Sequence, residues 1–252
     1  MRTEPYSSTQ VLERSAILLD VLSMAKEPMT LSHVAAAAKL PVSTTHRLLN
    51  SMWSFGYVQQ NQKGRWELGL RLFELGRKVY DRQDLRQYAL PVMVSLQTNV
   101  PLNIYLGIRH HNQFFVIEEL CAPDMVVRST THLGKPTPLH SIAGGKLFLA
   151  RYNPIDFRQY IEDTPMERIT EHSLLRQDEL LVQLSRIREY GWASEREERQ
   201  VNVVSVAVPI IGNDGKMLAA LCAESRLPRD ISHLEIHYLV NAGKAIGMLL
   251  RH

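Results

Sequence analysis

Apolar residues recur at intervals of three and four positions in three successive segments near the start of the chain, and this period predicts three short amphipathic helices. The first covers residues 12–22 and ends before Glu27-Pro28. Thr30 stands where an N-cap hydroxyl belongs, so a second helix of about eight residues is expected to follow it and to end before Pro41.

The third predicted helix begins after Pro41 and has a polar outer face. Ser43 is expected to cap the free amides at its start. Its inward positions are Thr45, Leu48, Leu49 and Met52, and its outward positions are Ser43, Thr44, His46, Arg47, Asn50 and Ser51. Two helices joined by a turn of about four residues, the second exposing hydrogen-bonding side chains at its N-terminal end, form a helix-turn-helix. A solvated, well-capped helix start is the alternative for this segment.

From this helix, the residues expected to contact DNA are Ser43, Thr44, His46, Arg47 and Asn50. Short hydroxyls at a helix N-terminus suit phosphate oxygens, whereas Arg47 can reach a phosphate or, bidentately, a guanine edge.

The segment YVQQNQKGRWEL, residues 57–68, places two β-prone flanks around a turn at 61–64, which predicts a hairpin that serves as the wing. Lys63 and Arg65 at its tip are expected to contact the DNA backbone or the minor groove. No acidic residue occurs between Glu27 and Glu67. An acid-free surface suits a polyanion such as DNA.

A linker helix at 68–82 and a further helix at 85–98 are expected to lead into a second domain, where short β-branched and aromatic runs alternate with helical periods. Strands are expected at 102–108, 113–120, 125–130, 203–211 and 217–225, and helices at 173–190 and 230–250. Elements mixed in this order predict an α+β domain with an antiparallel sheet from about residue 83 onward.

The chain of 252 residues is 45% hydrophobic and long enough for two domains. It has no apolar run of membrane-spanning length and no signal-peptide core at its start, so we expect a soluble, cytoplasmic protein with no membrane partner. The two cysteines, Cys121 and Cys222, form no CxxC pair, and the ten histidines show no standard ligand spacing. We therefore expect no disulfide, no metal and no other cofactor.

Several motifs together resemble the IclR-type bacterial transcription regulators, named for the isocitrate lyase regulator. They are SAILLDVL, LPxST-HRLL at 40–49, FGYV, LGLRLFELG, PLHSIAGGK at 138–146, GWASEREE at 191–198 and VAVPIIGNDGKMLAAL at 206–221. The resemblance covers nearly the whole chain. It implies a winged helix-turn-helix DNA-binding domain at 1–67, a linker helix at 68–82, and a GAF- or PAS-like effector-binding and oligomerisation domain at 83–252.

The resemblance also implies a homodimer or homotetramer on DNA, with an apolar face on the linker helix formed by Leu68, Leu72, Leu75 and Val79. Three positions depart from the family pattern. Lys39 replaces the usual turn glycine, so either the turn has another geometry or a non-glycine residue accepts a positive φ. Asn202 stands where relatives usually have glycine, and Ser205 where they usually have cysteine.

Carried over residue by residue, the family's effector pocket falls on Ile142, Ala143, Glu195, Ser205, Cys222 and Glu224. Free amides where a helix opens suit a carboxylate, and buried carboxylates demand donors, which ligand hydroxyls supply. A sugar acid such as an aldonate is therefore favoured over pyruvate or an aromatic acid. Three alternatives stay open: the small residues that open the helix near 143 serve only close packing, the sign-alternating run 195–199 is a solvated face, or Glu224 points away from the pocket.

Three functions remain compatible with the chain. The favoured one is a DNA-binding transcriptional regulator, a repressor of a catabolic operon, that binds a palindromic operator and responds to a small organic acid; it needs no catalytic residue. The second is an enzyme with Cys121 or Cys222 as its nucleophile. The third is a DNA-binding protein whose C-terminal domain is purely structural. Ligand-dependent operator affinity separates the first from the third, and turnover would identify the second.

Overall fold

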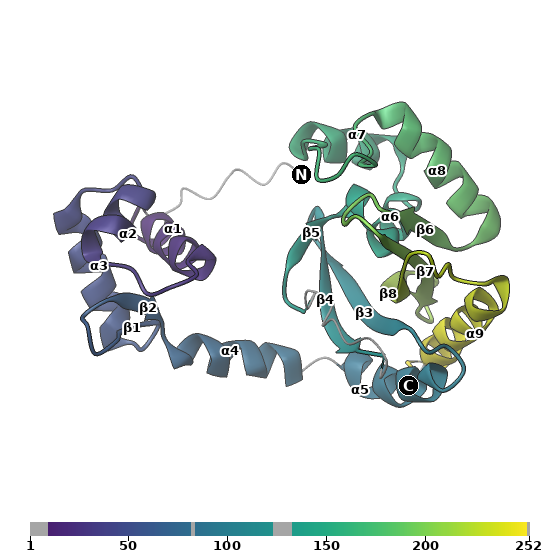
Figure 1. Ribbon diagram of the computed structural model, residues 1–252, viewed down its shortest axis with the longest axis horizontal. Helices are drawn as coiled ribbons and strands as arrows, with labels where there is room; N and C mark the ends of the chain where they lie inside the picture. The colour runs from purple at the N-terminus through teal and green to yellow at the C-terminus, as the bar shows by residue number, and fades with distance from the viewer. Residues whose placement is uncertain (1–9, 82–83, 123–132, 251–252) are drawn as a thin grey trace. The chain divides into compact units, whose positions relative to one another are not determined.

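The computed structural model describes residues 10–81, 84–122 and 133–250, except for the side chains of residues 79–81 and 84. The chain divides into two compact units, residues 1–82 and 83–252 (Figure 1), and each is considered by itself.

The first unit is a winged helix-turn-helix followed by one further helix. Its elements are α1 (Gln10–Met24), α2 (Leu31–Ala37), α3 (Val42–Ser54), β1 (Val58–Gln60), β2 (Trp66–Leu68) and α4 (Leu70–Asp81). The three helices and the hairpin enclose one apolar core, which Leu18, Val34, Leu49 and Trp66 occupy with almost no exposed surface. The predicted inward positions of α3 are all buried, because they share one face of the helix.

The turn between α2 and α3 keeps the left-handed backbone that a glycine would supply, although the residue there is a lysine. Lys39 has a φ of 54°, so the non-glycine residue does accept a left-handed backbone here. The predicted cap at Thr30 is confirmed, since its hydroxyl accepts a hydrogen bond from the amide of His33 at 3.3 Å. The predicted cap at Ser43 is wrong. Pro41 is the N-cap and Ser43 lies inside the first turn of α3, where its side chain caps no amide.

The wing is a hairpin held by its turn. The Asn61 side-chain oxygen accepts hydrogen bonds from the amides of Lys63 at 2.9 Å and Arg65 at 3.0 Å, and Gly64 has a φ of 68°. These bonds keep Lys63 and Arg65 at an exposed tip. The expected start of the linker helix at Leu68 is wrong, because that residue pairs with Val58 and ends β2.

Helix α4 has a mixed surface. Leu72 and Leu75, from the expected apolar face, are half-buried, and the side chain of Val79 lies outside the described residues. Among the described apolar side chains of α4, Leu70 and Phe73 are the most exposed, with exposed fractions of 73% and 69%. The division into a domain ending at residue 67 and a separate linker stays a prediction.

In the described part of the second unit, six strands form a sheet with the order β5-β4-β3-β8-β7-β6, and all its strand pairs are antiparallel. The strands are β3 (Asn103–His110), β4 (Gln113–Leu120), β5 (Pro136–Pro138), β6 (Ala193–Arg196), β7 (Val203–Ile211) and β8 (Met217–Arg226). The helices are α5 (Asp84–Gln97), α6 (Ala143–Leu149), α7 (Pro154–Asp163), α8 (Gln177–Tyr190) and α9 (His233–Leu249). The predicted α+β class and antiparallel sheet are confirmed.

Helices cover both faces of this sheet. Helices α5 and α9 pack on one face, while α6 packs on the other and contacts α8 (Figure 1). Strand residues alternate between two apolar clusters, so that Tyr105 and Cys222 face α6 whereas Leu106 and Leu221 face α5 and α9. The expected strand at 125–130 lies outside the described residues. The sequence patterns did not predict strands β5 and β6 or helix α7.

Candidate functional site

The N-terminal half of α3 presents a polar surface to solvent. Ser43, His46 and Arg47 are exposed, and Thr44 and Asn50 are half-buried. The side chains of Asn50 and His46 are hydrogen-bonded to each other, with 3.1 Å between Asn50 Nδ2 and His46 Nε2. Arg47 makes no hydrogen bond or ion pair with any residue that the structure describes. Its guanidinium is therefore available for a phosphate or a base edge.

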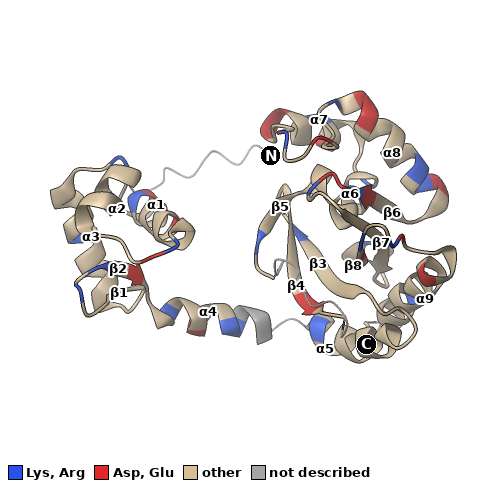
Figure 2. Ribbon diagram, viewed as in Figure 1, with Lys and Arg blue, Asp and Glu red and all other residues tan. Residues whose placement is uncertain are grey.

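Charge on this unit favours a polyanion. Neither α3 nor the wing turn at 61–65 carries an acidic residue (Figure 2). Lys63 and Arg65 are exposed. The helix start and the wing tip are the two parts of a winged helix-turn-helix that reach a duplex. The seven residues expected to contact DNA thus lie on exposed or half-exposed positions of one unit.

The six residues expected to hold an effector gather on the α6 side of the sheet. Glu195 pairs with Ser205, and Ser205 with Glu224, so these three side chains form a row across β6, β7 and β8. We call them the carboxylate row. Their exposed fractions are 2%, 1% and 1%. The alternatives of a solvated run and of an outward Glu224 are therefore wrong, because the register turns both carboxylates toward α6.

The other three residues lie beside the row. Cys222 precedes Glu224 by two positions on β8 and so points to the same face, and Ile142 and Ala143 open α6 above the sheet. Helix α6 lies close against strand β8 here, since a side-chain carbon added at Gly144 would lie 3.0 Å from Cys222 Sγ. Burial raises the pKa of Cys222, which keeps the thiol protonated and poorly nucleophilic.

Both carboxylates of the row receive donors from the chain itself. Ser205 Oγ donates to Glu195 Oε2 at 2.8 Å, and the backbone amide of Arg199 donates to Glu195 Oε1 at 3.1 Å. The Arg199 guanidinium lies 3.1 Å from Glu224 Oε2. Burial raises the pKa of Glu195, and the charge of Arg199 opposes that shift. Arg199 thus joins the two carboxylates, although the sequence did not point to it.

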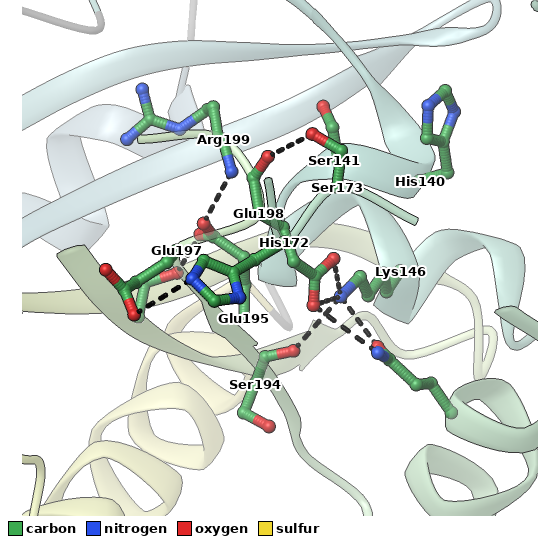
Figure 3. Close-up of polar contacts among 12 residues, drawn as sticks. His140, Ser141, Lys146, His172, Ser173, Ser194, Glu195, Glu197, Glu198 and Arg199 are labelled. Carbon is green, nitrogen blue, oxygen red and sulfur yellow. Dashed lines mark hydrogen bonds and ion pairs between the residues drawn. The ribbon is translucent and has the colours of Figure 1, made fainter. Parts of the chain in front are cut away.

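A second buried ion pair fixes the loop after β6 to helix α6 (Figure 3). Lys146 is fully buried, and its Nζ donates to the Glu198 oxygens at 2.6 and 2.5 Å and to Gln183 Oε1 at 2.6 Å. Burial lowers the pKa of Lys146, while the Glu198 carboxylate acts in the opposite direction. This lysine, in the small-residue run that opens α6, has a structural partner and is not left for a ligand.

Two residues of the loop after β6 adopt a left-handed backbone conformation. Glu197 and Asn202 have φ values of 58° and 62°. The Glu197 side chain accepts a hydrogen bond from the Asn202 amide at 2.8 Å, and Thr170 and Ser173 donate to the carbonyl oxygen of Glu198 at 3.1 and 2.9 Å. Asparagine tolerates this backbone better than most residues, which explains how it replaces the usual glycine at 202.

Comparison with known families agrees with this two-part architecture. The model of the bacterial transcriptional regulator IclR C-terminal domain matches residues 77–240, and the IclR helix-turn-helix model matches residues 11–62. The chain belongs to the IclR family of bacterial transcriptional regulators. Its members are regulators, so the chain is a DNA-binding transcriptional regulator and not a cysteine-dependent enzyme.

Individual IclR-family relatives match over most of their length. The transcriptional repressor AllR of Escherichia coli K12 is 30% identical over 88% of this chain and 83% of that protein. The transcriptional regulator KdgR of Dickeya chrysanthemi is 28% identical over 97% of this chain and 80% of that protein. The crystal structure of an IclR homologue from Microbacterium hydrocarbonoxydans, complexed with 4-hydroxybenzoate, is 25% identical with a TM-score of 0.82, and the match covers 95% of this chain and 98% of that one.

Two further properties concern the part of the chain that the structure describes. None of its helices is long and apolar enough to cross a membrane. No group of three or more histidine, cysteine, aspartate or glutamate side chains is arranged there to hold a metal ion.

Proposed function

We propose that this regulator is a repressor of a catabolic operon, that it binds a palindromic operator as a homodimer or homotetramer, and that a small organic acid controls the binding. The exposed, acid-free start of α3, with Arg47 unengaged, is the observation that carries the DNA-binding part. The DNA contacts proposed are Ser43, Thr44, His46, Arg47 and Asn50 from α3, with Lys63 and Arg65 from the wing. That the relative AllR is named a repressor supports the direction of regulation.

A palindromic operator requires two recognition helices related by two-fold symmetry. The exposed Leu70 and Phe73 of α4 support self-association, because large apolar side chains gain free energy when a partner covers them. Light scattering should therefore detect no monomer at micromolar concentration. A stable monomer that binds one half-site tightly would contradict the proposed assembly.

For the effector site we propose the region where the start of α6 meets the carboxylate row, formed by Ile142, Ala143, Glu195, Ser205, Cys222 and Glu224. The relative in complex with 4-hydroxybenzoate supports an organic acid. Within this arrangement Ser205 and Arg199 already satisfy the two carboxylates. A ligand that displaces Ser205 or Arg199 from the carboxylates has to donate hydrogen bonds to Glu195 and Glu224 in their place. The hydroxyl groups of a polyhydroxylated acid such as an aldonate can do this. The Arg199 guanidinium, once released, can pair with the carboxylate of the ligand.

Calorimetric titration of the full-length protein with gluconate, 4-hydroxybenzoate and pyruvate tests this assignment. Gluconate is expected to bind, and Glu224→Ala to abolish that binding. Glu189→Ala, which removes an exposed carboxylate on α8, is the matched control and should leave gluconate affinity unchanged. Binding of only the aromatic or keto acid, or an affinity that Glu224→Ala does not change, would refute the sugar-acid assignment. Gluconate that binds without altering operator affinity would refute the regulatory role.

A further inference from the structure

A separate polar cavity of about 610 Å³ lies between the end of β3, helix α7 and the β7–β8 turn. Its polar walls include Arg109, Arg151, Tyr152, Asp156, Gln159 and Lys216, and none of the six proposed effector residues lines it. Along β3, Arg109 lies six residues beyond Asn103, which pairs with Glu224. At ~3.3 Å per residue this places the cavity roughly 20 Å from the carboxylate row. Its volume is typical of small-molecule sites, which span ~300–1,000 Å³.

Positive charge in this cavity is only partly compensated. Lys216 is paired with Asp214 at 2.9 Å. Arg109 and Arg151 form no ion pair with any residue in the described parts of the chain, and Asp156 is the carboxylate among the lining residues. Two guanidinium groups that face one shared space and lack carboxylate partners favour an oxyanion, because each can donate two parallel hydrogen bonds to it.

Arg109 is held in place before any ligand arrives. Its Nη1 donates to the Tyr152 hydroxyl at 2.7 Å, and its guanidinium carbon lies 5.5 Å from the centre of the Tyr152 ring. A side chain that is already ordered loses little entropy on binding, so its contacts contribute more to affinity. Tyr152 leaves further guanidinium N–H groups of Arg109 available to an anion.

We propose that this cavity binds a phosphate monoester of a hydroxylated metabolite, of the size of a sugar phosphate. The two charges of the phosphate match the two arginines better than a single carboxylate does. Asp156 accepts hydrogen bonds from ligand hydroxyls, and the Gln159 amide can donate or accept. The site is distinct from the proposed effector site, so one can be occupied without the other.

Titration calorimetry of the full-length protein with glucose 6-phosphate tests the proposal, with glucose and inorganic phosphate as comparison ligands. Glucose 6-phosphate is expected to bind more tightly than inorganic phosphate, and glucose not to bind. Arg109→Gln and Arg151→Gln should each weaken glucose 6-phosphate binding about tenfold or more, because each removes charge-assisted hydrogen bonds. Arg158→Gln, an exposed position on α7 outside the cavity, is the matched control and should bind as the wild type does.

Three results would overturn the proposal. They are no binding at millimolar glucose 6-phosphate, equal binding of glucose, or arginine variants that bind as well as Arg158→Gln. The basic DNA-binding unit also attracts anions, so binding that Arg47→Ala abolishes and Arg109→Gln does not would place the ligand there instead. Glu224→Ala should leave glucose 6-phosphate affinity unchanged, which separates this test from that of the proposed effector site.

Discussion

Replacing Lys146 by methionine should strongly destabilise the second unit. The Lys146 side chain is fully buried and the Glu198 side chain is only 8% exposed. The substitution removes the cation and leaves the Glu198 carboxylate among buried residues with Gln183 as a weaker neighbour. A buried charge that loses its partner destabilises a protein by about 3 to 5 kcal/mol, because the charge has neither water nor a counter-ion.

The expected change in melting temperature follows from this magnitude. For a unit of this size, each kcal/mol corresponds to about 2 to 4 °C, so Lys146→Met should melt roughly 6 to 20 °C below the wild type. The double variant Lys146→Met/Glu198→Leu removes both charges and should recover much of the loss. Lys244→Met changes an exposed lysine on α9 and is the matched control.

Differential scanning calorimetry of the full-length protein is the appropriate assay, because it measures the melting temperature directly. The reasoning fails if Lys146→Met melts within about one degree of Lys244→Met. It also fails if the double variant is less stable than Lys146→Met alone, since the pair would then not be the source of the loss.

Three further predictions concern other parts of the chain. Lys39→Gly should raise the free energy of unfolding by about 0.5 to 1 kcal/mol, because glycine adopts the φ of 54° without strain; a decrease in chemical denaturation would contradict this. Burial, and secondarily Lys146, lower the pKa of His140 from 6.5 to about 4. The unfolded chain therefore binds a proton that the folded chain excludes, and stability should decrease by about 1 to 2 kcal/mol as the pH falls from 6.5 toward 4; an identical pH dependence in His140→Gln would argue against this cause. Lys63→Ala and Arg65→Ala should each weaken binding to all duplexes alike and lower the salt slope by about one, whereas a sequence-selective loss would show that the wing reads bases.

The first unit was largely predictable because its information is local. The helical spacing of the apolar residues Leu48, Leu49 and Met52 identifies the buried face of α3. The same spacing places Arg47 on the solvent-exposed face. The errors were at the ends of elements. Ser43 has a suitable hydroxyl, but the helix begins two residues earlier than a Ser43 cap requires. Competing start positions one or two residues apart cannot be ranked from side-chain type alone.

The site in the second unit depends on contacts between residues far apart in the chain. Alternating charges at 195–199 predict a solvated face from local pattern, yet Glu195 and Glu198 are buried. Their partners are Ser205 and Lys146, and Lys146 lies 52 positions away from Glu198. The pocket positions came from the family resemblance, and only the strand register could decide which way Glu224 points.

The most direct test of the DNA-binding account is selection of duplexes from a random-sequence library by the full-length protein, with Arg47→Ala compared in parallel. The wild type should enrich a palindromic site, and Arg47→Ala should lose that enrichment, because each half-site loses a base contact worth about 1 to 3 kcal/mol. Lys78→Ala, an exposed position on α4, should enrich the same site as the wild type. Failure of the wild type to enrich any sequence, or enrichment of the same palindrome by Arg47→Ala, would contradict the assignment of α3 as the helix that reads DNA.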